Sequence, residues 1–173
     1  VNAKVSRPSV CNAVDAILVD KAIAVPFLSA LKNEFEKEGV ELYADKAAHA
    51  ILKGYPHLHK AKAEDFGREF LSLKCAVKIV DNMDAALLHI AEYSTKHSES
   101  ILSENQSTCE AFIRQVDAAV VYSNASTRFT DGEVFGLGAE IGISTQKLHA
   151  RGPFALEKLV TEKWILRGKG QIR

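Results

Sequence analysis

Residues 76–91, Ala-Val-Lys-Ile-Val-Asp-Asn-Met-Asp-Ala-Ala-Leu-Leu-His-Ile-Ala, encode a strand that runs directly into a helix. The first five residues form a short apolar run, rich in β-branched side chains, that is typical of a buried strand. Asp81 or Asn82 then supplies a side-chain oxygen that caps the helix. Apolar side chains follow at helical spacing at Met83, Leu87, Ile90 and Ala91. Strands that lead into amphipathic helices are the repeating unit of an α/β fold.

The same alternation extends on both sides of this unit. We predict further strands at residues 1–7, 40–43, 100–102 and 118–123. We predict further helices at residues 10–19, between Pro26 and Gly39, at 45–53, and through Cys109, Phe112, Ile113 and Val116. The pattern indicates an α/β fold with a largely parallel sheet flanked by helices. Functional residues are then expected at the carboxyl ends of the strands.

The composition is that of an ordinary globular domain. The chain has 173 residues, of which 47% are hydrophobic and 25% charged, and its formal net charge is zero. A neutral chain argues against nucleic-acid binding, which usually needs a basic excess. It contains no apolar run long enough to span a membrane and no signal peptide, so we expect a cytoplasmic protein without a membrane partner. The chain starts at Val1 without a methionine, and we expect it to be part of a longer protein.

The three cysteines have different expected roles. They are odd in number and widely spaced, which argues against a disulfide framework and a structural zinc site. Cys75 begins an apolar strand and Cys109 lies on an apolar helical face, so both are predicted to be buried. Cys11 follows a proline turn and starts the predicted helix at 10–19, where a helix N-terminus would stabilise a thiolate. Cys11 is therefore the candidate nucleophile.

Two predicted loops are candidates for a functional role. Residues 54–68 are predicted to form a surface loop in which His57 and His59 are solvated, with no third metal ligand in sight. No metal site is predicted. Residues 124–152 interrupt the alternation with a polar, turn-rich run and then a glycine-rich run, and long loops of this kind are usually functional or mobile. The glycine spacing does not match a dinucleotide-binding fingerprint.

Two blocks resemble a known family. The first runs from Val1 to Cys11-Asn12-Ala13, and the second comprises NASTRFTDG at 124–132, FGLGAEIGIST at 135–145 and HARGP at 149–153. Together they resemble the gamma-glutamyl phosphate reductases of the aldehyde dehydrogenase superfamily, over essentially the whole chain. The resemblance implies an aldehyde-dehydrogenase-like catalytic domain at 1–152, with the NADP-binding domain upstream and absent from this chain. It also implies a returning tail at 153–173 that carries an oligomerisation strand.

The alternating tail at 159–168 could pair with another subunit or pack on its own domain, and the sequence leaves both open. The resemblance implies a homo-oligomer and a functional coupling to glutamate 5-kinase, with which the domain is fused in some organisms.

The family's reaction is the reduction of L-glutamyl 5-phosphate by NADPH to L-glutamate 5-semialdehyde and phosphate, in proline biosynthesis. The resemblance implies that Cys11 forms a thioester with the substrate. Two alternatives stay open: a hydrolytic aldehyde dehydrogenase, and a piece that serves only folding or assembly. We expect the isolated chain to be inactive in either case, because the cofactor domain would be missing.

Several further residues receive roles from the resemblance. Glu69 would bind the nicotinamide ribose, or be a solvated loop acid, and Phe135 would lie near the nicotinamide, or be a core aromatic. A substrate-gripping loop is predicted from Asn124, Ser126, Thr127, Arg128 and Phe129. Arg128 suits a carboxylate or phosphate because a guanidinium bonds bidentately, or it holds its own loop together. Additional positive charge is expected from Lys147, His149 and Arg151.

Overall fold

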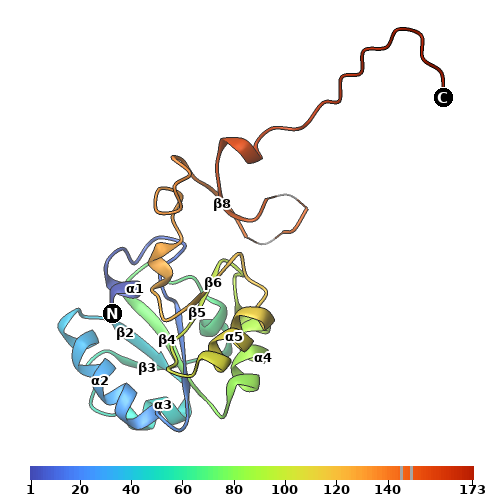
Figure 1. Ribbon diagram of the computed structural model, residues 1–173. Coiled ribbons are helices and arrows are strands. Elements are labelled where there is room, and N and C mark those ends of the chain that lie inside the picture. The colour runs from blue at the N-terminus through green and yellow to red at the C-terminus, as the bar shows by residue number, and fades with distance from the viewer. Residues whose placement is uncertain (145, 149) are drawn as a thin grey trace.

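The computed structural model describes residues 1–144, 146–148 and 150–173 (Figure 1). Its larger sheet has four parallel strands in the order β1-β4-β2-β3. These strands are β1 (Ala16–Asp20), β2 (Glu41–Ala44), β3 (Leu58–Lys60) and β4 (Lys74–Val80). Strand β4 lies between β1 and β2, and its Cys75, Ala76 and Val77 are fully buried. The apolar run in the sequence is therefore the centre of the sheet.

Two helices supply the core beside this sheet. Helix α2 (Ala24–Lys37) buries Leu28, Leu31 and Phe35, and it ends before Gly39, whose φ of 65° is favourable only for glycine. Helix α3 (Lys46–Ile51) begins after Asp45, whose carboxylate accepts a hydrogen bond of 2.7 Å from the Ala48 amide. The end of α2 before Gly39 and the start of α3 after Asp45 agree with the sequence prediction, whereas α2 begins at Ala24, two residues before the predicted start at Pro26.

A second, smaller sheet contains β5 (Ser98–Ile101) and β6 (Val120–Ser123), which pair in parallel. Helix α4 (Met83–Tyr93) and helix α5 (Gln106–Gln115) lie beside it (Figure 1). Asn82 and Asn105 cap these helices through their side chains, and Cys109 and Phe112 of α5 are buried. The strand-cap-helix prediction for residues 76–91 is thus confirmed.

The last part of the chain is extended. Strands β7 (Ile141–Ile143) and β8 (Gly152–Phe154) form an antiparallel pair. Short 3-10 helices occupy Thr127–Phe129 and Leu156–Lys158 in this part, and Ala63–Gly67 earlier in the chain. After Lys158 the chain runs away from the body, with Trp164 and Leu166 exposed (Figure 1). Among the described residues no strand follows Phe154, so the strand predicted at 159–168 is not formed within this chain; its pairing with another subunit stays a prediction.

The sequence predictions near the N-terminus are wrong. Residues 1–7 contain a short helix, α1 (Asn2–Val5), instead of a strand. The predicted helix at 10–19 is a turn followed by β1, because the run Ala16-Ile17-Leu18-Val19 pairs with the central strand β4. The spacing of apolar residues in this stretch fits a helix as well as a strand, and the pairing of β1 with β4 decides in favour of the strand.

The predicted loop at 54–68 also contains regular structure. Strand β3 includes His59, which stacks on Tyr43 at a centroid distance of 4.8 Å and approaches the Glu41 carboxylate to 3.2 Å. A metal-binding group of three or more His, Cys, Asp or Glu residues does not occur in the described ranges. Within the same ranges, each helix is too short or too polar to cross a membrane.

The core under α2 can be tested by truncation. We expect Leu28→Ala to lower the free energy of unfolding by about 3 kcal/mol, because Leu28 is fully buried and a cavity would remain. Urea denaturation followed by circular dichroism measures this change. The matched control is Leu88→Ala on α4, which should change stability by less than about 0.5 kcal/mol because Leu88 is 73% exposed. Equal losses at the two positions would contradict this description of the core.

Candidate active site around Cys11

Cys11 lies in a tight turn at the mouth of a pocket. The Ala13 amide donates to the Val10 carbonyl at 3.0 Å, which closes the turn around Cys11 and Asn12. Cys11 is the exposed cysteine, whereas Cys75 and Cys109 are buried, as the sequence predicts. The pocket has a volume of about 140 Å³. Its lining comes from residues 11–16, 66–69, 93–95 and 98–100, together with Thr127.

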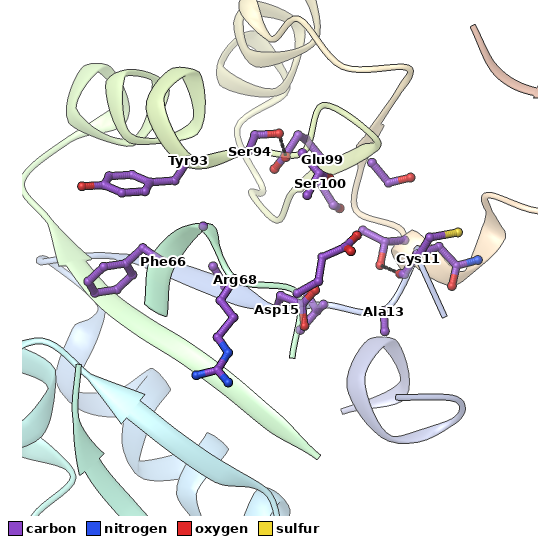
Figure 2. A pocket seen from close by; sticks show the side chains of 17 residues that line it. Cys11, Ala13, Asp15, Phe66, Arg68, Tyr93, Ser94, Glu99 and Ser100 are labelled. Carbon is purple, nitrogen blue, oxygen red and sulfur yellow. Dashed lines mark hydrogen bonds between the residues drawn. The ribbon is translucent and has the colours of Figure 1, made fainter. Parts of the chain in front are cut away.

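The pocket lies at the amino ends of three strands. Residues 11–15 precede β1, residues 66–69 precede β4, and Ser98 is the first residue of β5. Figure 2 shows Cys11 and Ala13 at one end of the pocket and Tyr93, Ser94 and Phe66 at the other. The pocket is therefore lined by segments that precede the strands. The expectation that functional residues lie at the carboxyl ends of the strands is wrong for this pocket.

Asn12 fixes the position of Cys11. Its side-chain amide donates to the Thr130 carbonyl at 2.8 Å, and its own carbonyl accepts from the Thr127 hydroxyl at 2.6 Å. The Asn12 side-chain oxygen also accepts a hydrogen bond from Arg128. Asn12 and both threonines are buried, so water competes little for these bonds. The loop after β6 thus holds the residue next to Cys11.

Arg128 braces the same turn from outside. Its Nε donates to the Ser6 hydroxyl at 3.1 Å and its Nη1 donates to Asn12. Ser126 adds a bond of 2.8 Å from its hydroxyl to the Asn2 side chain. These contacts match the interpretation of Arg128 as a structural arginine, although they leave part of its guanidinium free for a ligand.

An ion pair between a buried lysine and a partly exposed aspartate, which the sequence did not reveal, supports the other side of the turn. Lys4 is fully buried, and its ammonium lies 3.2 Å from an Asp15 carboxylate oxygen. The same oxygen accepts from the Phe70 amide at 3.2 Å. Asp15 therefore joins the nucleophile segment to the loop that carries Glu69. A lysine in a short polar stretch carries no sequence signal for burial, because charged residues are mostly exposed.

The surroundings of Cys11 raise the pKa of its thiol. Burial raises the pKa of Cys11 most, and the carboxylates of Glu140 and Glu69 raise it further. The Cys11 backbone N–H and the Arg128 charge act in the opposite direction but do not prevail. The predicted helix N-terminus, which would have lowered this pKa, is absent here because the turn leads into a strand. The prediction of a helix-stabilised thiolate is thus wrong.

Glu140 does not line the pocket, but its charge raises the pKa of Cys11, an effect that the sequence does not reveal. Its carboxylate accepts from the Gly132 amide at 3.0 Å. Gly132 has no room for a side chain, since a Cβ would lie 2.5 Å from the Ala139 carbonyl oxygen and 2.7 Å from the Glu140 Cβ. In the sequence, Gly132 ends the polar run and Glu140 lies eight residues later, inside the glycine-rich run. That spacing is the sequence feature from which this contact could have been predicted.

The predicted substrate and cofactor residues lie in several places. Thr127 and Glu69 line the pocket. Asn124 has a φ of 54° and bonds Ser103 through both side-chain atoms, at 2.9 Å each, so it secures its own loop. Phe129 and Phe135 are exposed and do not line the pocket, which excludes Phe135 as a core aromatic.

The predicted cluster of positive charge is paired elsewhere. Arg151 and Lys147 contact the Asp117 carboxylate at 2.6 and 2.7 Å, and His149 lies outside the described residues. Hydrogen bonds from Arg151 and then Lys147 lower the pKa of Asp117 to about 2. These cations tie the segment after β7 to the end of α5, away from Cys11.

The chain is similar over its whole length to proteins named gamma-glutamyl phosphate reductase. One from Dehalococcoides mccartyi is 55% identical over 174 residues, which cover 99% of this chain and 41% of that protein. One from Clostridium acetobutylicum is 51% identical over 173 residues, which cover 100% and 41%. No family model matches the chain. The chain spans about two fifths of the length of these curated relatives, and the resemblance inferred from the sequence is confirmed over that segment.

Solved structures agree. The crystal structure of gamma-glutamyl phosphate reductase from Thermotoga maritima is 48% identical, covers 99% of this chain and 41% of that chain, and has a TM-score of 0.91. An acetylating aldehyde dehydrogenase from Geobacillus thermoglucosidasius is 18% identical over 77% of this chain and 37% of its own, with a TM-score of 0.56. The second likeness concerns the fold alone. The predicted α/β fold of the aldehyde dehydrogenase type is confirmed.

The electrostatics of the pocket predict how charge changes alter Cys11. We expect Glu140→Gln and Glu69→Gln each to lower the pKa of Cys11, because each removes a negative charge that opposes the thiolate. Arg128→Gln should raise it. The pH dependence of iodoacetamide alkylation, followed by mass spectrometry of the Cys11 peptide, measures these shifts. Glu34→Gln on the exposed surface of α2 is the control, and a shift as large as that of Glu140→Gln would count against a local effect.

Proposed function

We propose that this chain is the catalytic-cysteine portion of a gamma-glutamyl phosphate reductase. The whole protein would reduce L-glutamyl 5-phosphate to L-glutamate 5-semialdehyde and phosphate, in the proline biosynthesis of the cytoplasm. One observation carries the proposal: the exposed Cys11 is held at the mouth of a pocket by the polar loop at 124–132. Relatives of that name, which are 51–55% identical, support the assignment.

The first chemical step is acyl transfer to sulfur. The Cys11 Sγ forms a bond to the acyl carbon while the bond from that carbon to the phosphate oxygen breaks, which leaves a thioester on Cys11. Negative charge develops on the acyl oxygen during the attack. The Cys11 backbone N–H lies close enough to Sγ to lower the pKa of the thiol, and it is therefore also suited to stabilise this oxyanion.

The second step requires a hydride donor, which NADPH would supply when it is bound. Glu69 fits a cofactor role because it lines the pocket with Cys11, is exposed, and makes no ion pair with the described residues. Its carboxylate would accept hydrogen bonds from the nicotinamide ribose, and the exposed ring of Phe135 would approach the nicotinamide. The rest of the cofactor site would belong to a domain upstream of Val1.

The loop after β6 is proposed to bind the substrate. It comprises Asn124, Ser126, Thr127, Arg128 and Phe129, of which Thr127 lines the pocket. Arg128 has guanidinium N–H groups beyond those that bond Ser6 and Asn12, and these suit the phosphate or the α-carboxylate. The tail at 153–173 is proposed to pair with another subunit, because its last part is extended and exposes the apolar side chains of Trp164, Ile165 and Leu166.

A hydrolytic aldehyde dehydrogenase is the second candidate. Two carboxylates, Glu140 and Glu69, lie near enough to Cys11 to raise its pKa, and a carboxylate near the thioester could activate water. The two candidates differ in their need for phosphate. The reductase, run in reverse, oxidises the semialdehyde only when phosphate releases the thioester, whereas the hydrolytic enzyme needs none.

We expect the protein with its upstream sequence restored to reduce NADP with glutamate 5-semialdehyde only when phosphate is present, as followed by absorbance at the NADPH band. Cys11→Ala should lower kcat/KM by about 10⁴-fold or more, because it removes the nucleophile. Cys109→Ala is the matched control and should retain activity, because Cys109 is buried in α5. Phosphate-independent turnover would favour the hydrolytic enzyme, and activity in the Cys11→Ala variant would refute the covalent mechanism.

A further inference from the structure

A fully buried lysine faces the carboxylate of Asp15 at the edge of the Cys11 pocket. Lys4 lies in α1, and its ammonium is 3.2 Å from Asp15 Oδ1. Asp15 lines the pocket, and its side chain is 27% exposed (Figure 2). A buried ammonium is stable mainly where a carboxylate compensates its charge. Lys4 therefore restricts the Asp15 carboxylate to one position beside the pocket.

The backbone on both sides of this ion pair is also fixed. The Val14 amide donates to the Ala3 carbonyl at 3.0 Å, which joins α1 to the segment between Cys11 and β1. The Asp15 carbonyl accepts a hydrogen bond of 2.8 Å from the Ala76 amide of β4. Asp15 is thus a rigid point between the nucleophile turn and the central strand.

The same carboxylate oxygen reaches the loop that precedes β4. Asp15 Oδ1 accepts a hydrogen bond of 3.2 Å from the Phe70 amide, which belongs to the peptide bond between Glu69 and Phe70. The Phe70 ring is buried, and its centroid lies 5.2 Å from that of Tyr43 in β2. Glu69 itself is exposed and lines the pocket. The position of Glu69 therefore depends on how the next residue, Phe70, is anchored.

The backbone directly after Phe70 is strained. Leu71 has a φ of 53°, which is unfavourable for a residue with a bulky side chain, and it is 56% exposed. Such a conformation persists only where the surrounding contacts impose it. The Asp15–Phe70 bond supplies one such contact, and the Ser72 hydroxyl donates to the Phe70 carbonyl at 3.0 Å. Without the Asp15 acceptor this stretch could relax and carry Glu69 with it.

We propose that Asp15, held by the buried ammonium of Lys4, is a positioning residue that fixes the place of Glu69 relative to the Cys11 sulfur. Cys11 and Glu69 line one pocket but lie on separate segments of the chain. Asp15 is four residues after Cys11 and is hydrogen-bonded to the residue after Glu69. A single carboxylate oxygen thus connects the two groups.

The consequence for the reaction rests on the proposed function. There Glu69 binds the nicotinamide ribose, so its distance from the sulfur decides where the hydride donor meets the thioester carbon. Acyl transfer to Cys11 does not use Glu69, and the turn is held separately through Asn12. A displaced Glu69 would therefore weaken cofactor binding and slow hydride transfer while the sulfur stays in place.

Two double variants of the protein with its upstream sequence restored separate the hydrogen bond from the charges. Both contain Lys4→Met, because a change of Asp15 alone would leave a buried ammonium uncompensated. Lys4→Met/Asp15→Leu has no acceptor for the Phe70 amide. Lys4→Met/Asp15→Asn keeps an acceptor in a side chain of nearly the same shape and is the matched control.

We expect Lys4→Met/Asp15→Leu to raise KM for NADP about tenfold, because the Glu69 contact is misplaced. Its kcat for phosphate-dependent oxidation of the semialdehyde should fall by roughly 10–100-fold, since small displacements of a bound reactant are costly. Lys4→Met/Asp15→Asn should keep both constants within about threefold of the wild type, because the neutral acceptor remains. Equal kinetic constants in the two double variants would overturn the role of the Asp15 acceptor.

A second readout measures the relative position of Glu69 and Cys11 without turnover. The Glu69 charge raises the pKa of Cys11, so Glu69→Gln should lower that pKa in the chain as it stands. We expect this shift to shrink in the Lys4→Met/Asp15→Leu background and to persist in the Lys4→Met/Asp15→Asn background. The pH dependence of Cys11 alkylation by iodoacetamide measures it.

The alkylation result also separates this proposal from the proposed function. A full shift in both backgrounds would overturn the positioning role of Asp15, whatever reaction the whole protein catalyses. Absence of phosphate-dependent NADP reduction in the wild type, with the shift lost only in the Lys4→Met/Asp15→Leu background, would overturn the proposed function alone.

Discussion

The hydrogen bonds of Asn12 are the constraint on which the site depends. The side chain and carbonyl of this one buried residue bond Thr127, Arg128 and Thr130 of the loop after β6. The nucleophile turn precedes the larger sheet, and this loop follows the smaller one. The position of Cys11 is therefore defined by both sheets at once, and the pocket forms where they meet. A loose loop after β6 would leave the sulfur without a fixed direction.

The pocket places the Cys11 thiol near two carboxylates. Burial has the largest effect on the pKa of Cys11 and raises it, because burial disfavours the thiolate. The charges of Glu140 and Glu69 raise the same pKa further. A raised pKa keeps more of this exposed thiol in its protonated form, which reacts more slowly with oxidants and alkylating agents.

Much of the fold could be predicted from local patterns, because strong apolar periodicity and caps coincide in residues 24–123. The helix of Met83–Tyr93 follows its cap at Asn82, and the central strand of Lys74–Val80 is mostly apolar, with two lysines at partly buried positions. The first 20 residues could not be predicted, since Ile17, Leu18 and Val19 fit a helix as well as a strand and only pairing with β4 decides. Cys11 was found from its local context together with the family resemblance. The contributions of Lys4, Asp15 and Glu140 were not, because each depends on residues far away in the chain.

Gly132 has a structural role that its identity as a glycine does not reveal in the sequence. Any side chain there would collide with Ala139 and Glu140, and the carboxylate bound to the Gly132 amide would have to move. Because glycine has no Cβ, the Glu140 carboxylate can stay bound to the Gly132 amide. From there its negative charge raises the pKa of Cys11, which is far away in the chain. An alanine at position 132 would therefore change the pKa of Cys11 without contacting Cys11. The local effect of that substitution is a steric clash, whereas its chemical effect is on a distant thiol.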